Sequence, residues 1–257
     1  MYDQFSKDYD RFVNWEARLS SEIPFLSDQL NALQAGSGRS VTVLDAACGT
    51  GRHVIALSDL GFECAGADFS KSMVEKARSN GNEAGHEIVF KQAGFGALSD
   101  VFGEESFDGV ICLGNSLPHI LDESGLAAAL GDFRRVMPLG GKLILQNRNF
   151  DQVLAEQSRF MTPQTYREGS RTWVFARFYD FDPDGRLTFN IQILSSLNGE
   201  DFSQQVISTR LWPMKRALLL SFLRAAGFGK FELFGNLEGD DYDERQSGNL
   251  VIVARAI

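Results

Sequence analysis

An acidic residue and two glycines stand close together where a β-branched run gives way to a helical pattern. Asp45 ends the run, and Gly49 and Gly51 follow it. Glycine lets the backbone approach a ligand closely, and the N-terminus of a helix presents unpaired N–H groups. A dinucleotide-binding loop would read G-x-G-x-x-G, but Val54 takes the third position. A carboxylate before the loop suits an ammonium group better than a pyrophosphate, so the pattern predicts a nucleoside that carries an amino acid.

A second carboxylate follows the next apolar run, about 20 residues beyond the glycines. Asp68 ends this run, and Ser70 can cap the helix that begins after it. A carboxylate at this position can accept hydrogen bonds from both hydroxyl groups of a ribose. Asp68 is therefore predicted to bind the ribose of the nucleoside.

The segments that position these residues alternate between strands and helices through the first half of the chain. We expect strands over 41–45, 62–67, 87–92, 107–113 and 142–146, and helices over 52–60, 71–79 and 126–137. Strands that alternate with helices at this spacing predict βαβ units and a mostly parallel sheet. The expected fold class is therefore α/β, with a doubly wound sheet.

Beyond residue 150 the pattern changes to long aromatic and β-branched runs with turn residues between them. Strands over 171–182, 186–197 and 203–211 predict an antiparallel β-meander, inserted so that it caps the cleft of the α/β sheet. A helix that opens at Pro213 and strands over 230–234 and 249–254 then close the fold.

The glycine loop resembles the first motif of the class I S-adenosylmethionine (SAM) methyltransferases, acid-x-x-x-Gly-x-Gly, here Asp45-Ala46-Ala47-Cys48-Gly49-Thr50-Gly51. Two later segments are similar to those of glycine N-methyltransferase and related glycine/sarcosine methyltransferases. They are Cys-Leu-Gly-Asn-Ser-x-x-His from Cys112 to His119, and Arg-Asn-Phe-Asp from Arg148 to Asp151. The resemblance covers residues 1–150 well, whereas the insertion matches only in position and in its meander-like character.

The resemblance implies a Rossmann-like SAM-binding core over 41–150, a helical lid over 1–40, a substrate cap over 151–211, and a C-terminal helix with closing strands over 212–257. It implies cofactor contacts by Tyr9, Trp15 and Arg18 in the lid, and by Asp45, Ala47, Cys48, Gly49, Gly51, Asp68, Phe69, Met73, Gly94, Phe95 and Leu113 in the core. Gly94 stands where these enzymes commonly have an Asp or Asn that meets the adenine amino group. That contact would fall to the Phe95 backbone N–H. The helical spacing of the lid residues fits simple packing equally well.

The same resemblance identifies residues on the acceptor side. It implies that Arg148 and Asn149 lie near the donor methyl and the acceptor, where Asn115, His119 and Asn149 would be catalytic residues that orient the acceptor and Arg148 would bind its carboxylate. The positions of Arg171 and Arg177 on a predicted strand make them further candidates for binding the carboxylate. Arg171 and Arg177 are an even number of residues apart on one strand, so they share a face. An exposed sheet face is the alternative for these two arginines, and a satisfied histidine at a helix start is the alternative for His119.

The predicted activity is methyl transfer from SAM to a small polar metabolite, such as the amine of glycine, sarcosine or a related amino acid. Catalysis would come mainly from alignment of donor and acceptor. A hydroxyl acceptor would need a base, for which His119 is the candidate. An O-methyltransferase acting on another small molecule, and a SAM-binding sensor without turnover, remain the alternatives. The product of transfer would be S-adenosylhomocysteine.

Charge and composition disfavour several other classes. The 257 residues carry 25 Lys and Arg against 34 Asp and Glu, and a net charge of −9 repels nucleic acids. Three cysteines without a CxxC pair, and no apolar run long enough for a signal peptide or membrane span, predict a cytoplasmic protein without a membrane partner. The acidic run from Glu238 to Glu244 is typical of a solvated loop, so no metal is expected. A homo-oligomer is left open.

Overall fold

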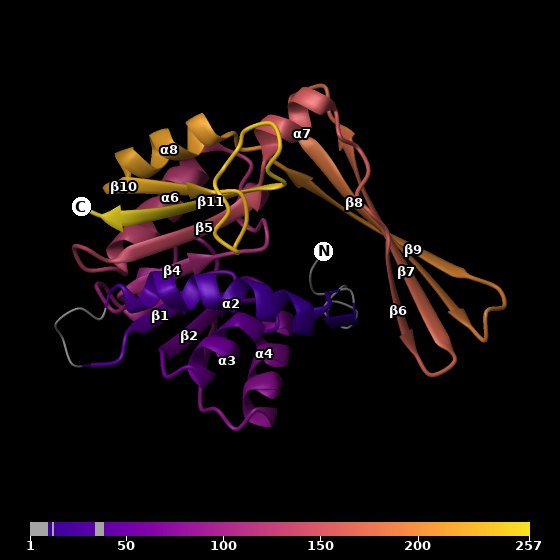
Figure 1. The fold of residues 1–257 in the computed structure, drawn as a ribbon, viewed down its shortest axis with the longest axis horizontal. Coiled ribbons are helices and arrows are strands. Elements are labelled where there is room, and N and C mark those ends of the chain that lie inside the picture. Colours follow the sequence, from indigo (N-terminus) through magenta and orange to yellow (C-terminus); the bar gives the residue numbers. More distant parts are fainter. Residues whose placement is uncertain (1–9, 12, 34–38) are drawn as a thin grey trace.

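The computed structural model describes residues 10–11, 13–33 and 39–257. Its centre is a seven-stranded sheet with the order β10-β11-β5-β4-β1-β2-β3 (Figure 1). The strands are β1 (Thr42–Asp45), β2 (Glu63–Asp68), β3 (Val89–Gln92), β4 (Gly109–Cys112), β5 (Lys142–Arg148), β10 (Phe228–Phe234) and β11 (Asn249–Ala256). Strands β1 to β5 pair with one another in parallel, whereas β11 is antiparallel to both β5 and β10. This is the predicted doubly wound, mostly parallel sheet.

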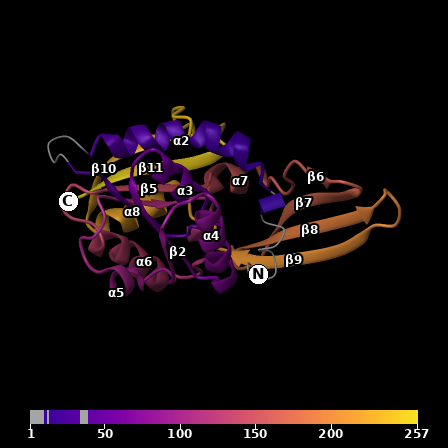
Figure 2. The same ribbon diagram turned by 90° about the horizontal axis from the view of Figure 1, so that it is seen from below.

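Helices cover both faces of the sheet, as Figure 2 shows. One layer contains α2 (Trp15–Asn31), α3 (Arg52–Asp59) and α4 (Lys71–Glu83), and the other α5 (Leu98–Phe102), α6 (Glu123–Arg135) and α8 (Arg216–Ala225). Successive strand residues serve opposite layers: Val43 clusters with Leu26 and Leu57, whereas Leu44 clusters with Phe133. Within the described ranges, no helix is long and apolar enough to cross a membrane.

Two helices begin where a carboxylate from a distant part of the chain supplies the cap. At the start of α5, the Leu98 backbone N–H donates to the buried carboxylate of Asp132 at 2.6 Å. At the start of α8, the Arg216 N–H donates to Asp151 Oδ2 at 2.8 Å. The prediction that α8 opens at Pro213 is therefore wrong, because the distant Asp151 caps this helix.

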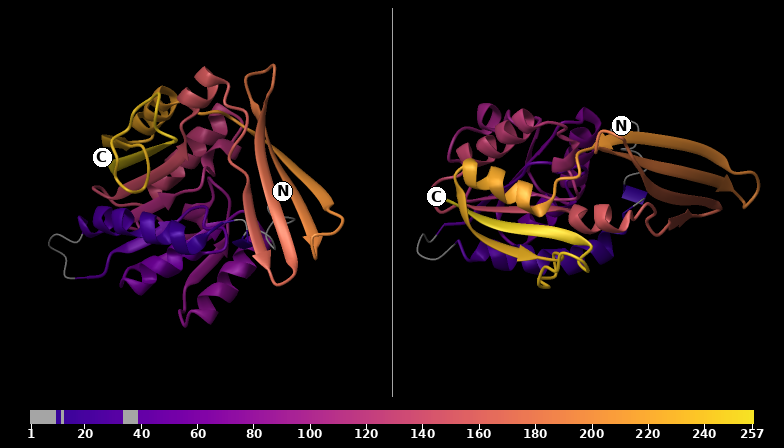
Figure 3. Two further views of the ribbon diagram at one scale, coloured as in Figure 1. Left: turned by 45° about the vertical axis from the view of Figure 1, so that its right-hand side comes forward. Right: turned by 90° about the horizontal axis from the view of Figure 1, so that it is seen from above.

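A second, antiparallel sheet projects from the core (Figure 3). Its order is β6-β7-β8-β9, with bounds Gln164–Glu168, Arg171–Phe181, Leu187–Leu197 and Ser203–Leu211. The last three are the strands of the predicted meander. The edge strand β6 is absent from the prediction, because all five of its residues are exposed and show no apolar alternation.

The end of the meander nearest the core packs on α7 (Phe150–Glu156), a helix that the prediction lacks. Phe150 and Val153 of α7 form one buried cluster with Tyr179, Leu187 and Leu211. These three come from β7, β8 and β9, so every strand of the meander is attached to the core at its base.

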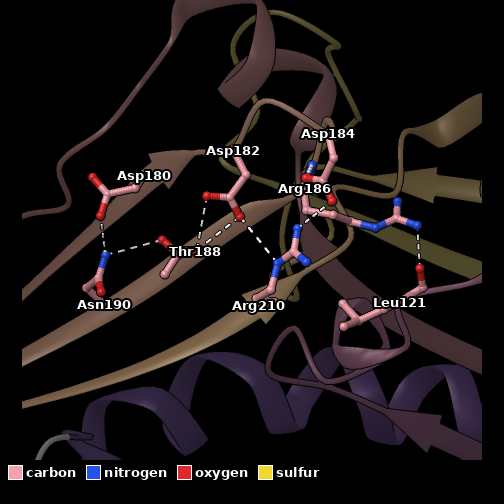
Figure 4. Close-up of polar contacts among 8 residues, drawn as sticks. All are labelled: Leu121, Asp180, Asp182, Asp184, Arg186, Thr188, Asn190 and Arg210. Atoms are coloured by element: carbon pink, nitrogen blue, oxygen red, sulfur yellow. Dashed lines mark hydrogen bonds and ion pairs between the residues drawn. The ribbon is translucent and has the colours of Figure 1, made fainter.

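Contacts at the β7–β8 turn also tie the meander to the segment before α6 (Figure 4). Arg186 donates to the carbonyl of Leu121, and its guanidinium carbon lies 4.7 Å from the centre of the Trp212 ring. The Trp212 backbone N–H donates to the Pro118 carbonyl at 2.8 Å. Both carbonyls belong to the segment that carries His119, so the meander helps to position this histidine.

Candidate active site

A cavity of about 800 Å³ lies between the carboxyl ends of the parallel strands and the base of the meander. Residues that follow β1, β2 and β4 line one side, and side chains of β7, β8 and β9 line the other. The strand order reverses between β1 and β4. Doubly wound sheets bind their ligands at this point, so the cavity is the candidate active site.

The glycine loop after β1 is held in one conformation. Gly49 and Gly51 have φ values of +52° and +78°. A Cβ atom at Gly51 would lie 2.9 Å from the Phe90 ring, so only glycine fits there. The Gly49 N–H donates to Asp68 Oδ2 at 2.9 Å. The loop and the end of β2 are thereby fixed relative to each other at the cavity wall.

Asp45 is buried just before this loop and is only 3% exposed. Its Oδ1 accepts a hydrogen bond from the Ala47 backbone N–H at 3.2 Å. Burial raises the pKa of Asp45 from 3.8 to about 7; the Ala47 N–H opposes this rise, Asp68 adds to it, and Arg18 opposes it. A cation bound in the adjacent cavity would therefore stabilise the ionised carboxylate.

Arg18 lines the cavity from α2 and is held by a largely buried ion pair. Its Nε donates to both carboxylate oxygens of Glu22 at 3.0 Å, and Glu22 Oε2 also lies 2.6 Å from His53 Nε2. Burial acts to raise the pKa of Glu22, but its contacts with His53 and Arg18 outweigh burial and lower the pKa below 4.5. Glu22 thus stays ionised and fixes the Arg18 side chain.

The ends of β4 and β5 are joined by polar contacts at the cavity. Asn115 has a φ of +66°, and its Oδ1 accepts a hydrogen bond from the Arg148 backbone N–H at 2.9 Å. The Gly114 N–H donates to Gln146 Oε1 at 2.9 Å. All four residues line the cavity, so its geometry here depends on both strands.

Two arginines give this part of the cavity a positive charge. Arg148 comes from the end of β5 and Arg177 from β7, and both line the cavity. Burial lowers the pKa of Arg177, and the nearby charge of Arg148 lowers it further. Arg148 Nε and Asn147 Nδ2 are buried and have no hydrogen-bond partner in the described part of the chain. Because buried donors without partners are costly, this corner suits an anionic ligand.

Comparison with known proteins agrees with this arrangement. A family model described as a methyltransferase domain matches residues 43–141. The glycine/sarcosine N-methyltransferase of Aphanothece halophytica is 31% identical over 235 residues, which are 91% of this chain and 82% of that protein. The chain belongs to the SAM-dependent methyltransferase family.

Two further members of this methyltransferase family show how far the similarity extends. The glycine/sarcosine/dimethylglycine N-methyltransferase of Actinopolyspora halophila is 32% identical over 253 residues, and the match spans 97% of this chain but 41% of that relative. The crystal structure of a SAM-dependent methyltransferase from Clostridium acetobutylicum superposes with a TM-score of 0.78 at 15% identity. That superposition covers 99% of this chain and 98% of the other, so the two share a fold along their whole length.

Most residues predicted for the methyltransferase site do lie at the cavity. Those that line it are Arg18, Ala47, Gly49, Asp68, Phe69, Met73, Gly94, Phe95, Asn115, His119, Arg148 and Arg177. Asp45, Cys48, Gly51 and Leu113 are buried and do not form its surface. Tyr9 lies outside the described residues.

Two predicted residues lie elsewhere. Trp15 donates from Nε1 to Asp10 at 3.0 Å and is not part of the cavity wall. Arg171 is exposed at the far end of β7, and its guanidinium carbon lies 5.8 Å from the centre of the Trp173 ring. It shares a strand face with Arg177 as predicted, but the length of the strand carries it beyond the cavity. The prediction that Arg171 binds the carboxylate of the acceptor is therefore wrong.

Asn149 also has a different place from the predicted one. It is 0% exposed, and its Nδ2 donates to the carbonyls of Glu244 and Ser247, each at 2.9 Å. Its Oδ1 accepts hydrogen bonds from the Gln152 N–H at 3.3 Å and the Tyr242 hydroxyl at 3.0 Å. This side chain caps α7 and secures the C-terminal loop, so the predicted contact with the acceptor is replaced by a structural one.

Replacing Asn149 by alanine is expected to lower the free energy of unfolding by about 2–4 kcal/mol, because two buried carbonyls lose their donor. The KM for the acceptor should stay within about twofold, because Asn149 does not reach the cavity. Denaturant unfolding and steady-state kinetics below the melting temperature measure the two effects. A large fall in kcat with unchanged stability would restore the catalytic interpretation.

The cavity residues that the sequence prediction missed include the polar side chains of Glu22, Gln146, Asn147 and Asn249. A signal for two of them was present, because polar residues 146–149 follow a buried apolar strand without a break. Asn249 pairs with Arg148 only through the antiparallel register of β11 and β5. The sequence carries no local sign of that pairing.

The glycine at position 94 makes room for an aromatic ring. A Cβ atom at Gly94 would lie 3.2 Å from Phe69 Cδ2. Phe69 is 81% exposed and lines the cavity. An exposed ring in a cavity is a suitable stacking surface for a flat ligand such as adenine. Within the described residues, no group of three or more His, Cys, Asp or Glu side chains gathers as a metal site.

Proposed function

We propose that this enzyme transfers a methyl group from SAM to the amine of a small amino acid whose carboxylate is held by Arg148 and Arg177. The observation that carries the proposal is the pair of arginines at one wall of the cavity, Arg148 and Arg177, together with the buried Arg148 Nε, which has no hydrogen-bond partner among the described residues. A carboxylate would accept hydrogen bonds from them and would offset the two positive charges. The relatives named for glycine and sarcosine support an amino acid acceptor.

The other end of the cavity fits SAM. Asp45 would pair with the ammonium group, and Arg18 with the carboxylate of the methionine moiety. Asp68 would accept hydrogen bonds from the ribose hydroxyls, while Phe69 and Met73 would pack beside the adenine. When bound, SAM supplies a methyl group already activated on a sulfonium centre.

The chain's own residues would orient the acceptor and exclude water. Burial lowers the pKa of His119 to about 4, so its imidazole is neutral at physiological pH and can accept a hydrogen bond from an amine. Asn115 lies beside Arg148 and offers its amide at the same wall. Orientation of two reactants supplies several kcal/mol of the rate enhancement. The meander covers the cavity, which limits the access of water.

The test is incubation of the purified protein with methyl-labelled SAM and glycine, sarcosine or a pooled extract of small metabolites, followed by mass spectrometry. We expect the label on the nitrogen of an amino acid. Label on a hydroxyl group alone would make the protein an O-methyltransferase. Binding of SAM without any labelled product would favour a sensor, and either outcome would overturn the proposal.

A further inference from the structure

Three half-buried apolar side chains line the cavity from three different segments: Ile120, Met161 and Phe189. Ile120 follows the 3-10 helix η1 (Leu117–His119), Met161 precedes β6, and Phe189 lies on β8. Each of them retains exposed surface although it is large and apolar. Apolar surface of this kind, gathered in a cavity, is stabilised when a ligand covers it.

Each of the three apolar residues is next to a polar residue of the proposed acceptor site. Ile120 follows His119 in the chain, and the Met161 backbone N–H donates to the Arg177 carbonyl at 3.0 Å. Phe189 is the cross-strand partner of Tyr179, and the two ring centres are 5.5 Å apart. Tyr179 in turn lies close to Arg148: burial raises the pKa of Tyr179, and the positive charge of Arg148 opposes this rise. The apolar surface therefore borders both the positively charged corner formed by Arg148 and Arg177 and the histidine.

The fully buried side chains of the same wall continue this surface. Ile191 pairs with Arg177 across the sheet, and Leu211 lies on β9; both line the cavity at 2% and 1% exposure. Among the described residues of β7, β8 and β9 that line the cavity, Arg177 is thus the charged residue, and its neighbours Ile191 and Phe189 are apolar. An acceptor without a side chain would satisfy the arginines and leave the apolar surface uncovered.

We propose that the preferred acceptor is an α-amino acid with an apolar side chain, which packs against Ile120, Met161 and Phe189 while Arg148 holds its carboxylate. This inference rests on the proposed function and names the acceptor class for the same site. The cavity of about 800 Å³ lies in the upper part of the range of about 300–1,000 Å³ that is typical of small-molecule pockets. Each methylene that the wall covers favours the larger acceptor.

The first experiment compares glycine, L-leucine and L-phenylalanine as acceptors with labelled SAM. We expect kcat/KM for leucine or phenylalanine to exceed that for glycine by about tenfold or more. Calorimetry with the enzyme saturated with S-adenosylhomocysteine should also give a tighter dissociation constant for that amino acid than for glycine. Methylation of glycine with equal or higher kcat/KM would overturn the inference but leave the proposed function intact. Methylation of no amino acid would overturn both.

The second experiment tests the wall itself. Phe189→Ala should lower the preference for the apolar amino acid over glycine by about tenfold. Phe178→Ala is the matched control, because Phe178 lies on the opposite face of the meander, where its ring centre is 5.9 Å from that of Phe160. An equal loss of preference in both variants, or in neither, would contradict the proposed contact. Met161→Ala provides the same comparison if the Phe189 variant fails to fold.

Discussion

Replacing Arg148 by methionine is expected to lower kcat/KM for the acceptor by about 10²–10³-fold and to change the dissociation constant of SAM by less than about threefold. Methionine is also long and unbranched, but it lacks the guanidinium that, with Arg177, makes this corner of the cavity positively charged. Removing one partner of a buried charge pair costs about 3–5 kcal/mol, and every 1.4 kcal/mol corresponds to a factor of about ten. Steady-state kinetics with the amino acid and calorimetry with SAM measure the two quantities.

The control for Arg148 is Arg171→Met on the same sheet as Arg177. The structure places Arg171 outside the cavity, so this variant should retain the kinetics of the unchanged enzyme. Arg148→Lys should recover part of the loss, because it restores the charge without the planar fork of donors. A comparable loss of SAM affinity in Arg148→Met would show that this arginine serves the cofactor end instead.

Elements whose structure is determined by neighbouring residues could be predicted from the sequence. The loop of Gly49 and Gly51 follows its strand and precedes its helix as predicted, because positive φ values and a close neighbour such as Phe90 demand glycine at that point. The β7–β9 meander was predictable for the same reason, since turn residues and apolar alternation are local signals.

Other elements depend on residues that are far away in the sequence. α5 is capped by Asp132 of α6, and α8 by Asp151 of α7, so neither helix start could be read from its own segment. The positions of the residues on the acceptor side of the cavity also depend on distant parts of the chain, so they could not be predicted from the sequence. Within one polar run, Asn147 faces the cavity while Asn149 secures the C-terminal loop, and only the packing of that loop separates the two.

Asp45→Asn is expected to make the protein more stable in the absence of SAM. Burial raises the pKa of Asp45 from 3.8 to about 7, so between about pH 4 and pH 7 the folded state retains a proton that the unfolded chain has lost. Stability from this group therefore falls as the pH rises through that window, and the full penalty remains above pH 7. This difference in pKa between the unfolded and the folded state corresponds to at most ~4 kcal/mol of folding free energy. Burying the neutral amide offsets part of the gain, so we expect about 2 kcal/mol at pH 8, or roughly 4–8 °C in Tm.

The pH series provides the control for that stability gain. At pH 4 the carboxyl group is largely protonated in the folded state, so Asp45→Asn and the unchanged protein should differ little in Tm. The exposed Asp201 in the β8–β9 turn is a second control, because Asp201→Asn should leave Tm unchanged at every pH. A destabilised Asp45→Asn protein at pH 8 would mean that the ionised carboxylate already has a strong partner in the fold.

The same substitution should weaken SAM binding by about 100-fold at pH 8, because the ammonium group of the cofactor loses its buried counter-charge. In the unchanged protein, SAM affinity should fall as the pH drops below about 7, where the carboxyl group of Asp45 takes up its proton. Binding near pH 7 should therefore release a proton, which calorimetry in buffers of different ionisation enthalpy detects. Asp45→Asn should abolish this release together with the pH dependence. If the variant binds SAM as tightly as the unchanged protein, another residue holds the ammonium group. The charge of Asp45 would then affect only the stability of the fold.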